Sequence, residues 1–373
     1  MADAPERHST APETQRLSRR EFLHLAQGVG LGVASAGLLA ACAPAAAPAP
    51  GGQAQPAAPA QRRMRDITFL LDVTPYGKHA LYYAGADHGE FARAGFNVKF
   101  ASGQGSGDVV RKIGAKAADF GLADTSAVIV ARAEGAMIKQ TFMTHYKNLM
   151  SVFSLKKHGI NQPKDLEGKT IATTAGDASL VMLPAFARIN NFDHTKVSTL
   201  VTDFPSKLPA VLAGRAHGSF DFYTSWPTWV RAGQRQNEEV SAMRYADWGL
   251  DIYNNGIVVH DDLLRSEPNM VKEFLHALAE AIAWAVENPD AANAITLKYN
   301  PALDRDTARD ELQVHIDHLM VDEVRRNGIG LMSEDKMRRT HQLVLENYDL
   351  KRPVEFEEFW TNEFAPRGII PKV

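Results

Sequence analysis

The clearest pattern of hydrophobic and polar positions opens the folded part of the chain. Residues 67–71 form a short apolar run rich in β-branched and aromatic side chains, and a turn with proline and glycine ends it. Residues 79–93 then have helical spacing, and residues 96–100 alternate as a second strand. This order predicts a βαβ unit of a parallel sheet. Ligands of such sheets bind beyond the carboxyl ends of the strands, so the loop 72–79 is the first candidate contact.

Two further strand-to-helix turns carry glycine or hydroxyl side chains. Residues 102–107 (SGQGSG) follow the second strand and precede a helix that begins at Asp108. Residues 124–126 (DTS) lie between a strand at 118–123 and the next helix. Glycines let backbone N–H groups turn toward a ligand, and the amino end of a helix favours a negative group. The same residues also serve as ordinary helix caps, so both roles stay open.

The second half of the chain repeats this design in another sheet. A strand at 170–174 is followed by a glycine-rich turn at 175–179 (AGDAS) and a helix at 180–190. The polar segment 156–169, marked by proline and glycine, precedes this strand, and we take it as the first crossing between two lobes. The pattern therefore predicts an α/β protein whose first lobe holds residues 65–156 and 255–373 and whose second lobe holds residues 157–254.

The amino end has the features of an export signal. Residues 18–23 (SRREFL) match a twin-arginine signal, and residues 39–42 (LAAC) resemble the lipobox, in which the cysteine becomes the lipid-bearing first residue. The alternative is that Cys42 is only a small residue of a cleaved signal. Residues 43–64 are rich in Ala, Pro, Gly and Gln, which is typical of a spacer. We therefore expect residues 1–42 to be a lipoprotein signal. The protein is expected to be exported to the periplasm or the cell surface and to be anchored to the membrane through Cys42.

Composition narrows the classes of function. The chain has 373 residues, of which 45% are hydrophobic, and this length suffices for about two domains. Its formal net charge of −3 gives no basic excess for nucleic-acid binding. Cys42 is the only cysteine, so the folded part is expected to lack disulfides, thiolate nucleophiles and cysteine-based metal sites.

One segment carries a family pattern. It reads LLDVTPYGKHALYYAGADHGEFARAGFNV at residues 70–98: a strand ending in an acid, a proline turn, a histidine, a helix and a second strand. This pattern resembles the opening of the ABC-importer solute-binding proteins for thiamine-pyrimidine precursors, sulfonates and nitrate. Further matches lie at 118–135, 159–171 and 208–227, so the resemblance covers roughly residues 65–365.

The resemblance has consequences for fold and partners. It implies a two-lobed periplasmic-binding-protein-like fold of type II, with a mostly parallel sheet flanked by helices in each lobe and two hinge crossings. It also implies a monomer that closes around a small molecule in the cleft between the lobes. The partners it implies are this ligand and the transmembrane subunits of an ABC permease.

An enzyme and a protein-binding adaptor are the two alternatives to a solute-binding protein. Fungal thiamine-pyrimidine synthases share the fold, and in them a lysine and a histidine lie in the segment that corresponds to residues 121–135, with a Cys-rich iron-binding motif farther on. Here the two matching positions are Ala123 and Ala127, and no cysteine follows Cys42. The comparison favours a binding protein without catalytic residues, cofactor or metal. A lipoprotein adaptor that recognises another protein is the third hypothesis.

The ligand site is expected in the loops that follow the strands. These loops hold aromatic rings and acids, Asp221 among them, whereas Lys78 and Lys147 are the available cations. Carboxylates accept hydrogen bonds from ring N–H and amino groups, and aromatic rings stack on flat rings. This favours a pyrimidine-like or flavin-like ring, with a sulfonate- or nitrate-type anion as the alternative. The predicted ligand-binding residues are Asp72, Tyr76, His79, Gln104, Ser106, Asp124, Thr125, Tyr146, Asp177, Ser179, Asp203, Trp226, Tyr253 and Asn254.

Replacing Arg19 and Arg20 together by lysine should retain the precursor in the cytoplasm, because the twin-arginine route depends on that pair. Cell fractionation with immunoblotting measures this, and Arg7→Lys is a control outside the motif. Cys42→Ala should instead release the exported protein from the membrane fraction. Unimpaired export of the double lysine variant would contradict the assignment of the signal.

Overall fold

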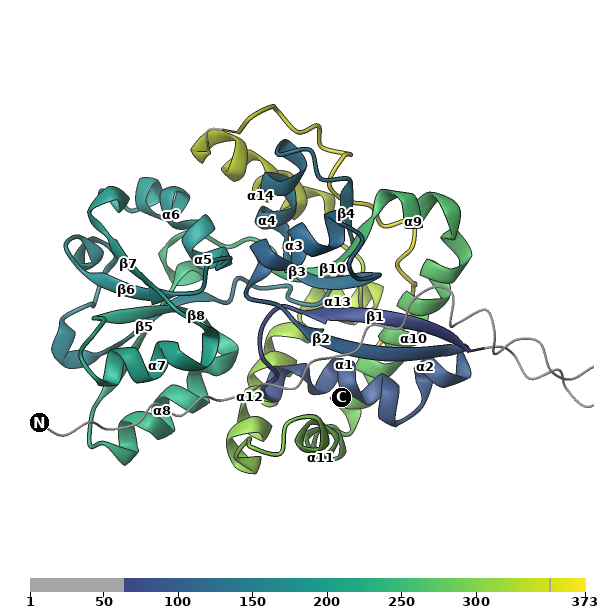
Figure 1. Cartoon of the computed structure of the whole chain (residues 1–373), viewed down its shortest axis with the longest axis horizontal. Coiled ribbons are helices and arrows are strands. Elements are labelled where there is room, and N and C mark those ends of the chain that lie inside the picture. Colours follow the sequence, from purple (N-terminus) through teal and green to yellow (C-terminus); the bar gives the residue numbers. More distant parts are fainter. Residues whose placement is uncertain (1–63, 349) are drawn as a thin grey trace, which may run out of the picture. The chain divides into compact units, whose positions relative to one another are not determined.

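The computed structural model describes residues 64–348 and 350–373. The export signal, Cys42 and residues 43–63 of the spacer lie outside the described residues. Two five-stranded sheets, each flanked by helices, form the frame of the described part (Figure 1). The predicted α/β fold with two lobes is therefore confirmed.

The first sheet has the strand order β2-β1-β3-β10-β4. β1 pairs in parallel with β2 and β3, whereas β10 runs antiparallel to both of its neighbours. The parallel part places the carboxyl ends of β1, β2 and β3 at one edge of the sheet, where ligand-binding loops belong. The strands are β1 (Arg65–Leu71), β2 (Phe96–Ser102), β3 (Phe120–Asp124), β4 (Ile138–Met143) and β10 (Asn255–His260).

The second sheet repeats this topology with the order β7-β6-β8-β5-β9. β6 pairs in parallel with β7 and β8, and β5 is the antiparallel strand. In each sheet the antiparallel strand is thus the one that follows a crossing from the other lobe. The strands are β5 (Met150–Leu155), β6 (Thr170–Thr173), β7 (Ser198–Val201), β8 (Gly218–Phe222) and β9 (Val240–Arg244).

Helices cover both faces of the first sheet. In Figure 1, α3, α4 and α14 lie above it, and α1, α2 and α10 lie below it. The helices of this lobe are η1 (Gly77–His79), α1 (Ala80–Asp87), α2 (Glu90–Arg93), α3 (Ser106–Gly114), α4 (Thr125–Ala133), α9 (Asp261–Ser266), α10 (Pro268–Glu287), α11 (Pro289–Tyr299), α12 (Arg305–Leu319), α13 (Asp322–Asn327) and α14 (Glu334–Asn347).

The second sheet is covered in the same way, with α5 and α6 above it and α7 and α8 below it in Figure 1. The helices of this lobe are η2 (Lys156–His158), η3 (Pro163–Leu166), α5 (Ala178–Val181), α6 (Leu183–Ile189), η4 (His194–Lys196), α7 (Phe204–Leu212), η5 (Tyr223–Ser225), α8 (Trp226–Arg235) and η6 (Tyr245–Trp248).

The first crossing lies earlier in the chain than the sequence predicts. β5 pairs with β8 and β9 of the second sheet, so the chain has already changed lobes when β5 begins at Met150. Residues 150–156 therefore do not belong to the first lobe, and residues 156–169 connect elements within the second lobe. The prediction was wrong because alternation identifies a strand but does not say which sheet the strand joins.

The two crossings between the lobes are joined by backbone hydrogen bonds. The N–H groups of Thr144 and His145 in the first crossing donate to the Asn255 carbonyl oxygen at 3.2 and 2.9 Å. The N–H of Asn254 in the return crossing donates to the His145 carbonyl oxygen at 3.1 Å. The His145 ring also stacks on His315 of α12, with ring centroids 4.3 Å apart. The hinge is thus a paired, buried segment rather than two loose connections.

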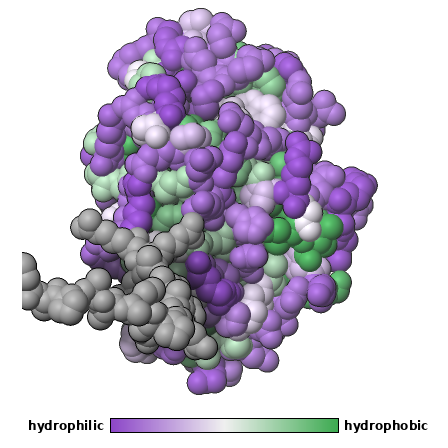
Figure 2. Space-filling model, turned by 90° about the vertical axis from the view of Figure 1, so that its right-hand side faces the viewer, coloured by the Kyte–Doolittle hydropathy of each residue, from purple (hydrophilic) through white to green (hydrophobic). Residues whose placement is uncertain are grey.

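The surface carries mostly polar side chains. Figure 2 shows the face at the right of Figure 1, where hydrophilic residues predominate and hydrophobic ones form limited groups. Among residues 64–348 and 350–373, none of the helices is both long enough and apolar enough to pass through a bilayer.

Phe274 of α10 is the centre of an aromatic cluster in the first lobe. α10 buries residues at spacings of three and four, so one face of the helix is apolar. The Phe274 ring stacks on Phe120 and Phe91 at centroid distances of 3.9 and 5.1 Å. It also meets Phe69 edge-on at 6.2 Å. The cluster holds α10 against β1 and β3, the two strands that position the first lobe's side of the site.

Phe274→Ala should lower the free energy of unfolding by about 3–5 kcal/mol, because it removes a fully buried ring from this cluster. Denaturant unfolding measures the change. Leu345→Ala is the control, since Leu345 is 40% exposed, and it should stay within about 0.5 kcal/mol of the parent. A change for Phe274→Ala no larger than that of the control would show that the cluster is not central to the core.

Candidate ligand-binding site

A cavity of about 40 Å³ lies between the two lobes, and we call it the inner cavity. Its walls come from the loops that follow parallel strands in both sheets, which is where such sheets bind ligands. The first lobe contributes Asp72, Val73, Tyr76, Lys78, Gly105 and Ser106, and the second lobe contributes Thr174, Asp177, Ala178, Phe204, Lys207, Asp221 and Phe222.

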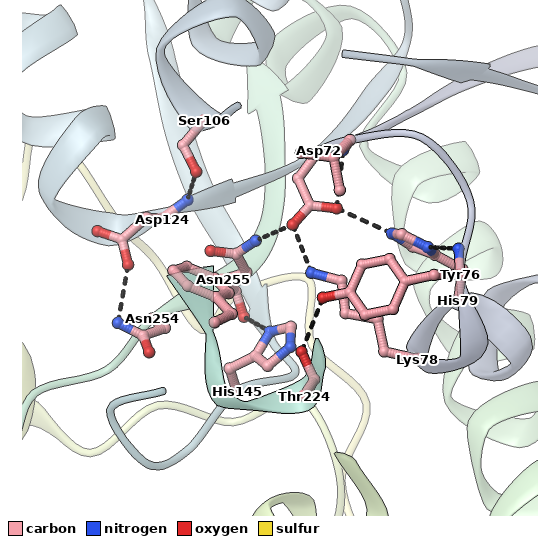
Figure 3. A network of polar contacts seen from close by, with 12 residues as sticks. Asp72, Tyr76, Lys78, His79, Ser106, Asp124, His145, Thr224, Asn254 and Asn255 are labelled. Atoms are coloured by element: carbon pink, nitrogen blue, oxygen red, sulfur yellow. Dashed lines mark hydrogen bonds and ion pairs between the residues drawn. The ribbon is translucent and has the colours of Figure 1, made fainter. Parts of the chain in front are cut away.

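Asp72, directly after β1, anchors the first lobe's side of the inner cavity (Figure 3). Its carboxylate accepts hydrogen bonds from the Lys78 ammonium at 2.5 Å, the Asn255 amide at 2.8 Å and His79 Nε2 at 2.9 Å. His79 Nδ1 accepts from the Tyr76 N–H at 3.1 Å, so the ring proton lies on Nε2 and points at Asp72. Burial alone would raise the pKa of Asp72, but the charge of Lys78 and the bond from His79 hold that pKa well below its usual range.

Lys207 of α7 is a buried ammonium group of the second lobe that lies beside carboxylates, as Lys78 does in the first lobe. Its ammonium lies 3.3 Å from an Asp221 oxygen and 3.5 Å from an Asp177 oxygen, and it donates to the Phe220 carbonyl oxygen at 2.5 Å. Burial works against the charged form, but the two carboxylates raise the pKa of Lys207 above its usual value. Burial raises the pKa of Asp221, Lys207 opposes this rise, and Asp177 adds to it.

The charges around the inner cavity nearly cancel. Two buried ammonium groups, Lys78 and Lys207, face three carboxylates, Asp72, Asp177 and Asp221. One carboxylate is therefore in excess when all five groups are ionised. Such a lining accepts hydrogen bonds from a neutral or cationic partner and disfavours an anion.

An aromatic pair crosses the cleft beside the inner cavity. The rings of Tyr76 in the first lobe and Phe204 in the second are stacked, with centroids 5.3 Å apart and planes inclined by 22°. The Tyr76 hydroxyl also shares a hydrogen bond of 2.7 Å with the Thr224 hydroxyl of the second lobe. Beside the inner cavity, the two lobes thus meet through stacked rings and neutral hydroxyl groups.

The two glycine-rich turns predicted from the sequence touch each other. The Gly107 N–H donates to the Gly176 carbonyl oxygen at 3.0 Å across the cleft. Gly105 has φ +98°, and a Cβ there would lie 2.6 Å from the Gly176 oxygen. A Cβ on Gly176 would lie 2.9 Å from the Asp108 backbone nitrogen. The glycines are needed because the backbones of the two lobes approach this closely.

Four of the sequence-predicted residues line the inner cavity: Asp72, Tyr76, Ser106 and Asp177. A second group lies just behind it and supports the lining. His79 orients Asp72, as described above. Asp124 caps α4 by accepting from the Ser126 N–H at 2.8 Å and also accepts from the Asn254 amide at 3.0 Å. The Thr125 hydroxyl donates to the Asn254 carbonyl oxygen at 3.1 Å, so these residues tie α4 to the return crossing.

The remaining predicted residues are not brought to the inner cavity. Gln104 and Asp203 are exposed, and Asp203 caps α7. Ser179 is buried beneath Asp177, to which its N–H donates at 2.9 Å. The other three pack or bond inside a lobe: Tyr146 accepts from the Gly330 N–H at 2.7 Å, Tyr253 donates to Glu323 at 2.5 Å, and Trp226 packs on Phe153 with ring centroids 5.2 Å apart.

Four residues that line the inner cavity were not predicted as ligand-binding residues from the sequence: Lys207, Phe204, Thr174 and Phe222. Helical spacing in the sequence does indicate that Lys207 is buried. It lies three residues after Phe204 and four before Val211, on a face of α7 that is otherwise apolar. A lysine on such a face must find buried carboxylates, and here it does.

The chain is similar in sequence to known proteins. The family model described as NMT1/THI5 like matches residues 77–292. The chain is 26% identical over 337 residues to the riboflavin-binding protein RibY of Chloroflexus aurantiacus, covering 88% of this chain and 92% of that protein. It is 24% identical over 235 residues to the 4-amino-5-hydroxymethyl-2-methylpyrimidine phosphate synthase of Schizosaccharomyces pombe, covering 60% of this chain and 66% of that enzyme.

Solved structures share the fold. The alkanesulfonate-binding protein SsuA of Xanthomonas axonopodis, bound to MOPS, has a TM-score of 0.63 at 11% identity and covers 79% of this chain and 98% of its own. The aliphatic sulphonate binding protein SsuA of Escherichia coli has a TM-score of 0.59 at 12% identity, with coverages of 79% and 92%. The chain thus belongs to the NMT1/THI5 like family, whose model matches more than half of it.

Proposed function

We propose that this chain is the lipid-anchored, extracytoplasmic solute-binding component of an ABC importer and that it binds a small heteroaromatic solute between its lobes. The observation that carries the proposal is the inner cavity, where both lobes present buried carboxylates whose ammonium partners belong to the protein itself. A ring with N–H or amino donors satisfies those carboxylates. The anchor rests on the motif around Cys42, outside the described residues.

The charge of the lining argues against the anion alternative. A sulfonate or nitrate needs donors or cations without a competing carboxylate. Lys78 and Lys207 are instead matched by Asp72, Asp177 and Asp221, which leave one carboxylate in excess. The likeness to sulfonate-binding proteins concerns the fold, at 11–12% identity, and does not carry their ligand over.

Two observations support a flat ring. The stacked pair Tyr76 and Phe204 offers aromatic faces at the edge of the inner cavity. The two related proteins described above are named after heteroaromatic compounds, riboflavin in one and a substituted pyrimidine in the other. Stacking on aromatic side chains contributes about 0.5–1.5 kcal/mol per ring pair beyond the buried area.

Binding is favoured over catalysis. Ala123 and Ala127, which stand where the related synthases have a lysine and a histidine, are 0% and 4% exposed in the first lobe's core. In the part of the chain that the structure describes, no three His, Cys, Asp or Glu side chains are grouped to hold a metal ion. The residues of the inner cavity then serve to recognise the solute, and closure serves to signal its presence to a permease.

A thermal-shift screen tests the proposal directly. Riboflavin and 4-amino-5-hydroxymethyl-2-methylpyrimidine represent the heteroaromatic class, and methanesulfonate represents the anions. We expect stabilisation by at least one heteroaromatic compound and none by methanesulfonate. The reverse result would refute the proposed ligand class.

Asp177→Asn should weaken binding of the heteroaromatic ligand by about 5- to 150-fold, since an unpaired buried donor on the ligand costs about 1–3 kcal/mol. Asp203→Asn is the matched control. Both aspartates cap a helix of the second lobe, and asparagine caps nearly as well, but Asp203 is exposed and away from the inner cavity. Calorimetry measures both affinities, and equal effects of the two variants would remove Asp177 from the site.

Gly176→Ala should reduce ligand affinity about tenfold or more, because its Cβ would meet the backbone of Asp108 and Gly107 only when the lobes close. Gly114→Ala is the control, since its Cβ would lie 3.3 Å from Ala136 within one lobe. Small-angle scattering should show contraction of the parent and the control with ligand, but not of Gly176→Ala. Full contraction and unchanged affinity in that variant would show that this contact plays no part in closure.

A further inference from the structure

A second and larger space adjoins the inner cavity. This outer chamber has a volume of about 380 Å³ and shares Tyr76, Phe204 and Asp221 with the inner cavity. α7 and α8 of the second lobe form one wall, and the loop after β1, the loop after α11 and α12 of the first lobe form the other. The two spaces therefore meet at the stacked aromatic pair.

Size separates the roles that the two spaces can have. About 40 Å³ is room for roughly three water molecules, which is too little for a ring system. About 380 Å³ falls within the usual range of roughly 300–1,000 Å³ for pockets that bury a drug-sized ligand. The body of a solute therefore fits the outer chamber, and only a small polar edge fits the inner cavity.

The lining of the outer chamber suits a flat body with apolar faces. Its floor holds the buried Trp229 and Ala308, and Pro75 and Leu208 add apolar surface from the two lobes. Most of the exposed lining surface is apolar, and the polar side chains include Thr228 and Glu311 at the junction of the lobes. Glu311 of α12, 2% exposed, accepts from the Gly77 N–H at 2.9 Å and from the Thr228 hydroxyl of α8 at 2.5 Å. A mostly apolar pocket with a few fixed polar groups is typical of small-molecule sites.

The rim of the outer chamber has a different character. Arg231 and Arg235 lie one helical turn apart on α8, and Asp304 lies on the opposite lobe. Arg235 and Asp304 are exposed, and Arg231 pairs with Asp310 of α12 at 2.5 Å.

We propose that the outer chamber holds the ring system of a fused, multi-ring heteroaromatic solute whose donor-bearing edge reaches Asp221 and the inner cavity beside Tyr76 and Phe204. This inference rests on the proposed function and narrows its ligand class. A single pyrimidine ring would leave most of the chamber unfilled, whereas three fused rings of the flavin type fill it. The two spaces are adjacent and share three lining residues, and this distinguishes the chamber from an incidental gap between lobes.

Filling the chamber tests the inference. Ala232 is half-buried and lines the chamber from α8, so Ala232→Trp reduces its volume. Gln234→Trp, on the same helix but exposed and outside both linings, is the matched control. Leu208→Trp, from α7 in the same wall, is a second filling variant if Ala232→Trp melts at a lower temperature than the control.

The probes are riboflavin, with three fused rings, and 4-amino-5-hydroxymethyl-2-methylpyrimidine, with one. We expect the parent to bind riboflavin at least 30-fold more tightly than the pyrimidine. Each filling variant should lose at least 30-fold in riboflavin affinity and keep the parent's affinity for the pyrimidine. Gln234→Trp should match the parent for both, by flavin fluorescence and by calorimetry.

Each of the following results would overturn the inference. Undiminished riboflavin affinity in both filling variants would show that the chamber holds no part of the ligand, and equal losses for both probes would show that the chamber does not distinguish a multi-ring body from a single ring. Binding of the pyrimidine but not of riboflavin by the parent would reject the multi-ring class and leave the proposed function standing. Binding of neither probe, or of methanesulfonate instead, would reject the proposed function as well.

Discussion

The site depends on one constraint: each lobe pairs its buried charges within itself. Asp72 is paired with Lys78 inside the first lobe, and Asp177 and Asp221 are paired with Lys207 inside the second. Removing one partner of a buried ion pair typically costs about 3–5 kcal/mol, because the other charge stays buried and unpaired. Since these pairs do not span the cleft, the lobes can separate without incurring that cost.

Much of the fold could be predicted from local sequence patterns. The predicted boundary between the lobes was wrong, and this error shows what local patterns do not determine. The strand–turn–helix segments and the glycine turns are encoded in short windows, so the two sheets and the loops at their carboxyl ends could be predicted. β4 and β5 are both alternating strands only a few residues apart, yet they join different sheets. The pairing partner of a strand is a long-range property, which alternation along the chain does not record.

The candidate site could be predicted only in part for the same reason. Asp124 and Asp177 each follow a strand and cap a helix, and nothing in their local sequence separates them. In the fold, the Asn254 amide of the return crossing engages Asp124, whereas Asp177 faces the inner cavity with Lys207. The walls of the outer chamber come from segments around residues 75, 205, 230 and 305. Because these segments are far apart in the sequence, no single motif predicts the chamber.

Contacts between the lobes around the site are individually weak. The hydrogen bond between the Tyr76 and Thr224 hydroxyls and the one from Gly107 to Gly176 contribute about 0.5–1.5 kcal/mol each. The ion pair of Arg231 with the exposed Asp310 adds about 0–1 kcal/mol. Shifting a two-state equilibrium from 1:99 to 99:1 requires about 5.5 kcal/mol of differential binding. A solute with donors for carboxylates of both lobes can supply this because those contacts form together only in the closed form. Under the proposed function, an anion would meet the excess carboxylate of the second lobe, so the charges that are paired within each lobe would also disfavour an anion as the solute that holds the lobes together.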